Sequence, residues 1–257
     1  MNACVRWESA RALFSAKKCV GSILNTNTHK RARAHANKEL HGMLNEPYVC
    51  VFDIETQQKI DDMRGKFRED KIKQLSISCA SIVTIPSSLC LDPKDSERAM
   101  ELASTRTFWV SGNGAESMDE MCKFLENAEL IVGYNLAGFD WLVCKKYFQD
   151  VFSYQRCCEK TLDVFSRIRD STGTWYKLDT LLKMNGLETK TADGLQAIEW
   201  WKKGELELLR LYCECDTQQC ARLALLPRVD LGAGRALSNY NFGVASALTS
   251  IRSSHGD

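Results

Sequence analysis

The sequence predicts an α/β fold, in which a mixed sheet carries helices on both of its faces. Short apolar runs typical of buried strands occur in the first two thirds of the chain. Segments with apolar residues at helical spacing lie between them, and a long helical stretch comes last. Strands interleaved with helices in this way are typical of a sheet that is covered on both sides.

The expected strands are apolar runs that end at polar or turn-forming residues. The clearest is Tyr48-Val49-Cys50-Val51-Phe52-Asp53, where apolar side chains continue almost to the end of the run. The polar residues 57–71 predict a loop after it. Pro86 is expected to stop the second strand, and Gly112-Asn113-Gly114 favours a turn after the third. In chain order, the expected strands cover residues 48–53, 75–85, 107–110, 130–133 and 161–164.

The expected helices carry apolar residues on one face. The first has Met118, Met121 and Leu125 at helical spacing. Gly204 is expected to divide the last helical stretch into two helices, and Pro227 is expected to end the second of them. In chain order, the expected helices cover residues 116–127, 138–148, 178–184, 195–203 and 205–226.

Charge is distributed unevenly along the 257 residues. Residues 1–45 carry eight Lys/Arg and two acids, a net charge of +6, whereas residues 46–226 carry 23 bases and 29 acids, a net charge of −6. We therefore expect a basic part at 1–45, which is a disordered extension or a targeting arm, and one domain at 46–226. The Gly- and Ser-containing residues 227–257 are expected to form a flexible tail. An acidic body fits bound metal cations, and a basic arm adds affinity for phosphates.

Several classes of protein are excluded by what the sequence lacks. No apolar run reaches about 18 residues, so no membrane span is expected. No secretory signal precedes the domain and the cysteines are scattered, which favours a reduced intracellular compartment. We expect the cytoplasm or the nucleus, and the basic N-terminal residues leave an organelle open. The pattern Gly-x-x-x-x-Gly-Lys-Ser/Thr does not occur, which excludes a P-loop.

Histidine is missing from residues 42–254. A histidine general base is therefore excluded in the predicted domain, and so are the Ser/His/Asp and Cys/His arrangements. Cysteine offers a separate alternative, a zinc-held interaction domain, although the spacing differs from that of common zinc sites. The other interpretation is that these cysteines are small core residues. The cysteines concerned are Cys157, Cys158, Cys213, Cys215 and Cys220.

Two acids follow the first expected strand at alternate positions, Asp53 and Glu55. Side chains two residues apart on a strand leave the same face, so both carboxylates can reach one metal ion. Alternating acids also mark a wet strand face. Here the preceding residues are apolar, and buried carboxylates need compensation because unpaired buried charge costs several kcal/mol. Metal coordination supplies that compensation.

A second polar group follows the strand at 130–133. Gly133 and Gly138 permit a tight passage into a helix whose first turn holds Asp140. An acid in a first turn is also favoured by the helix dipole alone. Asn135 lies in the same turn. Only the combination of Asn135, Asp140 and their position after a buried strand favours a functional site.

Tyr212 and Asp216 lie one turn apart on the last expected helix. Apolar residues continue the same face, so it is expected to point inward, where an aspartate needs a partner. The phenol is expected either to bind a water held by a metal at Asp216 or to pin the helix through a hydrogen bond to that aspartate. Tyr212 is the available substitute for a histidine general base.

Together these segments resemble the ribonuclease-H-like 3′–5′ exonuclease superfamily that uses four acidic ligands, in its tyrosine-containing branch. That branch has Asp-x-Glu, then Asn-x(2–3)-Phe-Asp, then Tyr-x-x-x-Asp, and all three patterns are intact here. Further segments resemble a predicted exonuclease family related to the proofreading domains of family-B DNA polymerases. They are Thr161-Leu162-Asp163-Val164-Phe165, Lys177-Leu178-Asp179-Thr180-Leu181, the stretch from Lys190 to Lys202 with Trp200 and Trp201, and Tyr212-Cys213-Glu214-Cys215-Asp216. The resemblance covers about residues 48–226.

The resemblance implies a ribonuclease-H-like mixed sheet flanked by helices on both faces and a site that holds two Mg²⁺ or Mn²⁺ ions. Asp53, Glu55, Asp140 and Asp216 are the implied metal ligands, and these four with Tyr212 are the implied catalytic residues. Thr56 and Asn135 are the implied contacts to the terminal nucleotide. Phe139 either stacks on a base there or belongs to the core.

The function implied is a metal-dependent 3′–5′ exonuclease that hydrolyses DNA or RNA from the 3′ end of a single strand. Proofreading or repair is the expected role, and a helicase or polymerase is an expected partner. The alternative is a catalytically inactive nucleic-acid-binding module of the same fold. Against it stands the presence of all four acids and the tyrosine.

Overall fold

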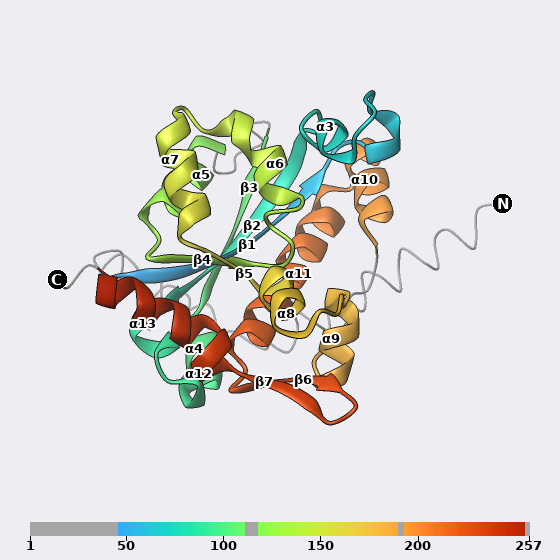
Figure 1. The fold of residues 1–257 in the computed structure, drawn as a ribbon. Helices are drawn as coiled ribbons and strands as arrows, with labels where there is room; N and C mark the ends of the chain where they lie inside the picture. Colours follow the sequence, from blue (N-terminus) through green and yellow to red (C-terminus); the bar gives the residue numbers. More distant parts are fainter. Residues whose placement is uncertain (1–45, 111–117, 190–192, 255–257) are drawn as a thin grey trace, which may run out of the picture.

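The computed structural model describes residues 46–110, 118–189 and 193–254 (Figure 1). Its centre is a five-stranded sheet in the order β3-β2-β1-β4-β5. β1 pairs antiparallel with β2 and parallel with β4, so the sheet is mixed as expected. β2–β3 is antiparallel and β4–β5 is parallel. The strands are β1 (Tyr48–Thr56), β2 (Ile77–Pro86), β3 (Ser104–Trp109), β4 (Leu130–Gly133) and β5 (Thr161–Asp163).

One face of the sheet is covered by three helices that follow β3 and β4. They bury their apolar residues against the even-numbered side chains of β1, which are Cys50, Phe52 and Ile54. The aromatic centre of this layer is Trp141, whose ring centroid lies 5.2 Å from that of Phe52. The helices are α5 (Met118–Asn127), α6 (Asp140–Cys144) and α7 (Val151–Glu159).

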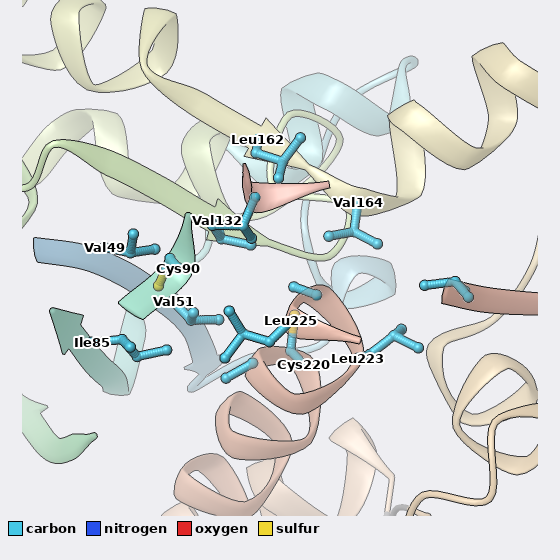
Figure 2. Packing of buried hydrophobic residues seen from close by; sticks show 14 of the residues in the cluster. Val49, Val51, Ile85, Cys90, Val132, Leu162, Val164, Cys220, Leu223 and Leu225 are labelled. Carbon is cyan, nitrogen blue, oxygen red and sulfur yellow. The ribbon is translucent and has the colours of Figure 1, made fainter. Parts of the chain in front are cut away.

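The other face is crossed by the long helix α11 (Leu206–Leu225), which contacts β1, β2, β3 and β4. Val49 and Val51 of β1 pack in one cluster with Cys220, Leu223 and other residues of its C-terminal half (Figure 2). The N-terminal half of α11 packs with α10. The remaining helices before it are α4 (Ser96–Glu101), α8 (Val164–Thr172), α9 (Leu178–Met184) and α10 (Gly194–Lys203).

The expected strands and helices are all present, with shifted boundaries. The predicted loop 57–71 contains a 3₁₀ turn at Ile60–Asp62 and the start of α3 (Arg68–Ile72). Pro86 is the last residue of β2 rather than the residue that follows it. The helix expected over 138–148 is α6 followed by a 3₁₀ turn at Lys145–Tyr147. The expected turn at Gly112 to Gly114 and the expected arm at 1–45 lie outside the described residues.

The flexible tail predicted after residue 226 is wrong for residues 228–254. They form a β6–β7 hairpin (Arg228–Gly232 and Arg235–Ser238), α12 (Asn239–Phe242) and α13 (Val244–Ser254). Val229, Leu231 and Leu248 are buried in the same core cluster as the end of α11. The buried Asn239 donates hydrogen bonds to the carbonyls of Ala224 and Leu226 and so ties the segment to α11. The apolar residues of this segment show little regular period in the sequence, but several of them are buried against the core.

No helix in the described ranges is both long enough and apolar enough to cross a membrane.

Candidate metal centre

Asp53 and Glu55 leave β1 on the face that α11 covers. The preceding odd-numbered residues Val49 and Val51 pack against α11, whereas Phe52 and Ile54 enter the opposite layer. The alternation that buries the valines therefore carries both carboxylates toward the same helix. Glu55 is buried and Asp53 is half-buried. The predicted common face of the two acids is confirmed.

Tyr212 and Asp216 approach these acids from α11. Both are buried, and they lie one turn apart on the side of the helix that faces the sheet. One carboxylate oxygen from each of Asp53, Glu55 and Asp216 lies within 4.8 Å of the others. Within the described ranges, this is the one group of three or more His, Cys, Asp or Glu side chains placed to hold a metal ion. A strand end and a helix distant in sequence thus meet as the family resemblance implied.

Asp140 reaches the site from the first turn of α6, on the other side of β1. It is buried, and its Oδ1 accepts a hydrogen bond from the backbone N–H of Ile54, at 3.3 Å. Burial raises the pKa of Asp140 well above its usual value, and the charge of Asp53 raises it further. Asp140 is therefore next to Asp53, although it is not in the group within 4.8 Å. A nearby cation would favour its ionised form.

Tyr212 is held between the acids and an aromatic support. Its phenol donates a hydrogen bond to Asp216, and its ring packs edge-on against Trp200 with centroids 5.8 Å apart. Burial raises the pKa of Tyr212, and the charges of Asp216, Glu55 and Asp53 raise it further. The phenol therefore keeps its proton at neutral pH and serves as a hydrogen-bond donor. A bond to Asp216 was one of the two interpretations of this residue from the sequence, and the other, a bond to a metal-held water, stays a prediction.

The turn that holds Asn135 is organised by an acid that sequence reasoning did not single out, Asp163. Its carboxylate accepts hydrogen bonds from the backbone N–H groups of Asn135, at 2.8 Å, and Ala137, at 3.1 Å. The same carboxylate caps α8 by accepting from Phe165 and Ser166. The available signal was an acid directly after an expected strand, at the position that caps the next helix.

Backbone geometry explains the residues of this turn. Asn135 has a φ of 65°, in the left-handed region that asparagine tolerates better than most residues. A Cβ on Gly138 would lie 2.4 Å from Asn135 Oδ1, so only glycine fits there without a shift. The turn therefore presents Asn135 and Asp140 together at the end of β4.

Asp163→Ala is expected to lower the free energy of unfolding by about 2–4 kcal/mol, because it removes a helix cap and leaves the part-buried N–H groups of Asn135 and Ala137 without their acceptor. Urea unfolding monitored by circular dichroism measures this. Asp170→Ala, on the exposed side of α8, is the matched control, and its change is expected to stay within about 0.5 kcal/mol. A loss for Asp163→Ala no larger than that of the control would contradict this role.

Asp53, Glu55 and Asp140 open into a pocket between α10 and residues 57–76, which join β1 to β2. Asn135, Phe139 and Thr56 line it together with Asp53, Glu55, Asp140 and Tyr212. Thr56 is buried and its hydroxyl donates to the carbonyl of Gln58. Phe139 is half-buried and also packs against the core cluster beneath. A further group of pocket residues escaped sequence reasoning because they lie in the segment expected to be a loop: Lys59, Lys66, Arg68 and Lys71.

The cysteines proposed for zinc do not gather. Cys157 lies in the cluster on the α5–α7 face, Cys213 packs beside α10, and Cys220 belongs to the cluster at the far end of α11. Burial raises the pKa of the Cys157 thiol to about 11, as expected of a core cysteine rather than a metal ligand. Cys157, Cys213, Cys215 and Cys220 are buried, and Cys158 is half-buried against the cluster on the α5–α7 face.

The two tryptophans of α10 have different environments. Trp200 is buried and supports Tyr212, whereas Trp201 is half-buried and packs at the edge of the same cluster. Adjacent positions on a helix face different ways, which accounts for the difference. Neither tryptophan lines the pocket that holds the acids.

Comparison with known proteins agrees with this fold. Residues 101–225 match the family profile RNase_H_2, described as RNase_H superfamily. The match covers just under half of the chain, and it agrees with the ribonuclease-H-like mixed sheet of the α/β class that the sequence predicts. No curated protein matches the chain.

Solved structures of exonuclease I are similar to part of the chain. Exonuclease I from E. coli, in complex with a 5cy-dT13 oligonucleotide, is 15% identical with a TM-score of 0.35, over 65% of this chain and 42% of that one. Exonuclease I in complex with the inhibitor BCBP is 14% identical with a TM-score of 0.36, over 65% of this chain and 43% of that one. This chain therefore spans less than half the length of those solved chains.

Proposed function

We propose that this protein is a metal-dependent nuclease that hydrolyses phosphodiester bonds of DNA or RNA from the 3′ end of a strand. The observation that carries the proposal is that carboxylate oxygens of Asp53, Glu55 and Asp216 lie within 4.8 Å of one another. Asp53 and Glu55 line a pocket that Asp140 and Tyr212 also line, and Asp216 is buried behind it. The ribonuclease-H-like fold supports a nuclease. The 3′–5′ direction rests on the three sequence motifs.

The donor set fits hard divalent cations. It consists of carboxylate oxygens alone, which suit Mg²⁺ or Mn²⁺ and are poor ligands for softer metals. Three carboxylates this close repel one another, and burial makes that repulsion more costly, so the group calls for a positive charge. Asp53, Glu55 and Asp216 would hold one cation, and Asp53 with Asp140 would hold a second. When bound, such a pair of cations supplies an activated water and charge stabilisation for in-line displacement at phosphorus.

The remaining residues of the site would position the nucleic-acid strand and hold hydrogen-bonding groups in place. The phenol of Tyr212 keeps its proton and stays hydrogen-bonded to Asp216, which orients it toward the pocket floor. Asn135 and Phe139 line the pocket beside Asp140 and would contact the terminal nucleotide. The hydroxyl of Thr56 is directed to Gln58, so its role would be to hold the end of β1 in place.

The alternative is a nucleic-acid-binding module of the same fold without activity. The enzyme is favoured because Asp53, Glu55, Asp140 and Tyr212 line one pocket and the fourth acid, Asp216, lies beside Asp53 and Glu55. A proofreading or repair role with a helicase or polymerase partner rests on the motif resemblance alone.

The test of the proposed function uses single strands of DNA and of RNA labelled at the 5′ end, incubated with the pure protein and Mg²⁺ or Mn²⁺. The expected products are labelled ladders that shorten one nucleotide at a time from the 3′ end, and EDTA is expected to stop the reaction. A 3′-terminal block is expected to protect the strand. Intact strands with either metal would contradict the proposal, and so would cleavage within a strand whose 3′ end is blocked.

A further inference from the structure

Four cationic side chains from one short segment line the same pocket as the acids. The segment joins β1 to β2 and covers residues 57–76, and we call it the β1–β2 segment (Figure 1). Its pocket-lining cations are Lys59, Lys66, Arg68 and Lys71. Lys66 and Arg68 are exposed, and Lys59 and Lys71 are half-buried. The segment therefore forms a basic wall beside an acidic floor.

The wall is fixed in place by hydrogen bonds at its base. The backbone N–H of Gln57 donates to the carbonyl of Ser76, and the N–H of Ser76 donates to Gln58 Oε1, each at 2.9 Å. The side chain of Gln74 donates to the carbonyls of Arg64 and Asp70, which closes the segment on itself. The cations are thus carried on an ordered support.

Core packing fixes the other side of the segment. Ile72 of α3 and Leu75 are fully buried in the cluster that also contains the residues of α6. Lys146 donates to the carbonyl of Leu75, and Tyr147 Oη accepts from the N–H of Ile77 at 3.0 Å. α3 is therefore held against the same layer that positions Asp140.

The charges on this wall are available to a ligand. Within the described ranges, no ion pair joins a carboxylate to Lys59, Lys66, Arg68 or Lys71. Lys73 differs, because it pairs with Glu69 at 2.7 Å and does not line the pocket. The charge of Lys73, which caps α3, is thus neutralised by an ion pair, whereas among the described residues the four cations that line the pocket have no such pair.

We propose that the β1–β2 segment binds the backbone phosphates of the nucleic-acid strand whose end lies over the acids. This inference rests on the proposed function. The pocket contains five acids, Asp53, Glu55, Asp61, Asp140 and Asp193, so a polyanionic strand needs fixed positive charge to enter it. Lys and Arg beside the acids supply that charge and set the path of the backbone without reading its sequence. Phe67, 62% exposed between Lys66 and Arg68, adds an aromatic face within this basic run.

The test measures binding of a fluorescein-labelled 12-nucleotide single strand in EDTA, where no metal-dependent cleavage occurs. Fluorescence anisotropy gives Kd between about 50 and 200 mM salt for the wild type and for the triple variant Lys66→Gln, Arg68→Gln, Lys71→Gln. Each lost phosphate contact lowers the slope of log Kd against log salt by about 0.7, so the triple variant is expected to lose about 2. At about 0.1 M salt this corresponds to about 100-fold weaker binding.

Two controls separate a phosphate-binding wall from general charge or folding effects. Lys73→Gln removes one charge from the same helix but outside the pocket, and its slope is expected to equal that of the wild type. The variant Lys66→Arg, Arg68→Lys, Lys71→Arg keeps the charges and is expected to restore binding. A triple Gln variant with the wild-type slope, a wild type that does not bind the strand, or a Lys73→Gln variant as weak as the triple Gln variant would overturn the inference.

The same variants distinguish this inference from the proposed function. If the wild type digests the strand with Mg²⁺, the triple Gln variant is expected to raise KM and leave kcat within about twofold, because it removes binding made equally in the ground and transition states. A wild type that binds through the wall but digests nothing would contradict the nuclease and leave the wall supported. Digestion with unchanged KM and salt slope in the triple Gln variant would overturn the wall alone.

Discussion

Asp53→Asn is expected to reduce the rate of strand digestion about 1,000-fold or more while the fold remains intact. Asp53 is the acid that links the two halves of the site, because it lies within 4.8 Å of Glu55 and Asp216 and its charge acts on Asp140. Asparagine keeps the shape and one oxygen but removes the negative charge that holds a hard cation. Losing about 4 kcal/mol of charge stabilisation corresponds to a rate loss of about 1,000-fold.

The measurement is the initial rate on the 5′-labelled strand at saturating Mg²⁺. Asp179→Asn, on α9 and paired with Lys183 in solvent, is the matched control and is expected to keep full activity. Removing one of several repelling carboxylates is not expected to lower the melting temperature without metal. Wild-type activity in Asp53→Asn, or equal losses in the control, would place the chemistry elsewhere.

Tyr212→Phe is expected to lower kcat about 100-fold, within the range that one positioned hydrogen-bond donor at a reacting centre contributes. The substitution keeps the ring against Trp200 but removes the hydroxyl that is hydrogen-bonded to Asp216. KM is expected to change little, because the hydroxyl lies on the pocket floor rather than along the basic wall. Single-turnover digestion at saturating protein measures the effect on the chemical step.

Tyr154→Phe is the matched control for this substitution. Its hydroxyl donates to the carbonyl of Trp141 in the opposite layer, at 3.1 Å, so its removal costs a hydrogen bond away from the acids. The control is expected to lower stability by about 1 kcal/mol and to leave kcat unchanged. Digestion by Tyr212→Phe within about twofold of the wild type would limit Tyr212 to pinning α11.

The part of the site that follows from local periodicity was predictable from the sequence. Asp53 and Glu55 share a face because a strand alternates, and Tyr212 and Asp216 share one because a helix repeats. Their meeting was not derivable from spacing, because it depends on α11 crossing β1 on the face opposite α6. The resemblance to a known family supplied that step, and the structure now shows it for Asp53, Glu55 and Asp216.

The features that the sequence did not predict depend on tertiary packing. Residues 228–254 have little periodic apolar pattern, and packing against the end of α11 makes Val229 and Leu248 core residues. The cations of the β1–β2 segment are typical of a solvated loop until the segment is seen beside the acids. The role of Asp163 likewise depends on tertiary structure, because its carboxylate binds backbone N–H groups of the turn at Asn135, which lies earlier in the chain.

The central claim is that the carboxylates at the end of β1 and on α11 form a metal centre. Calorimetric titration of Mn²⁺ into the wild-type protein at neutral pH tests it most directly. The account predicts saturable uptake of two cations per chain, with uptake reduced in Asp53→Asn and unchanged in Asp179→Asn. Absence of Mn²⁺ binding by the wild type, or binding that Asp53→Asn leaves intact, would contradict it.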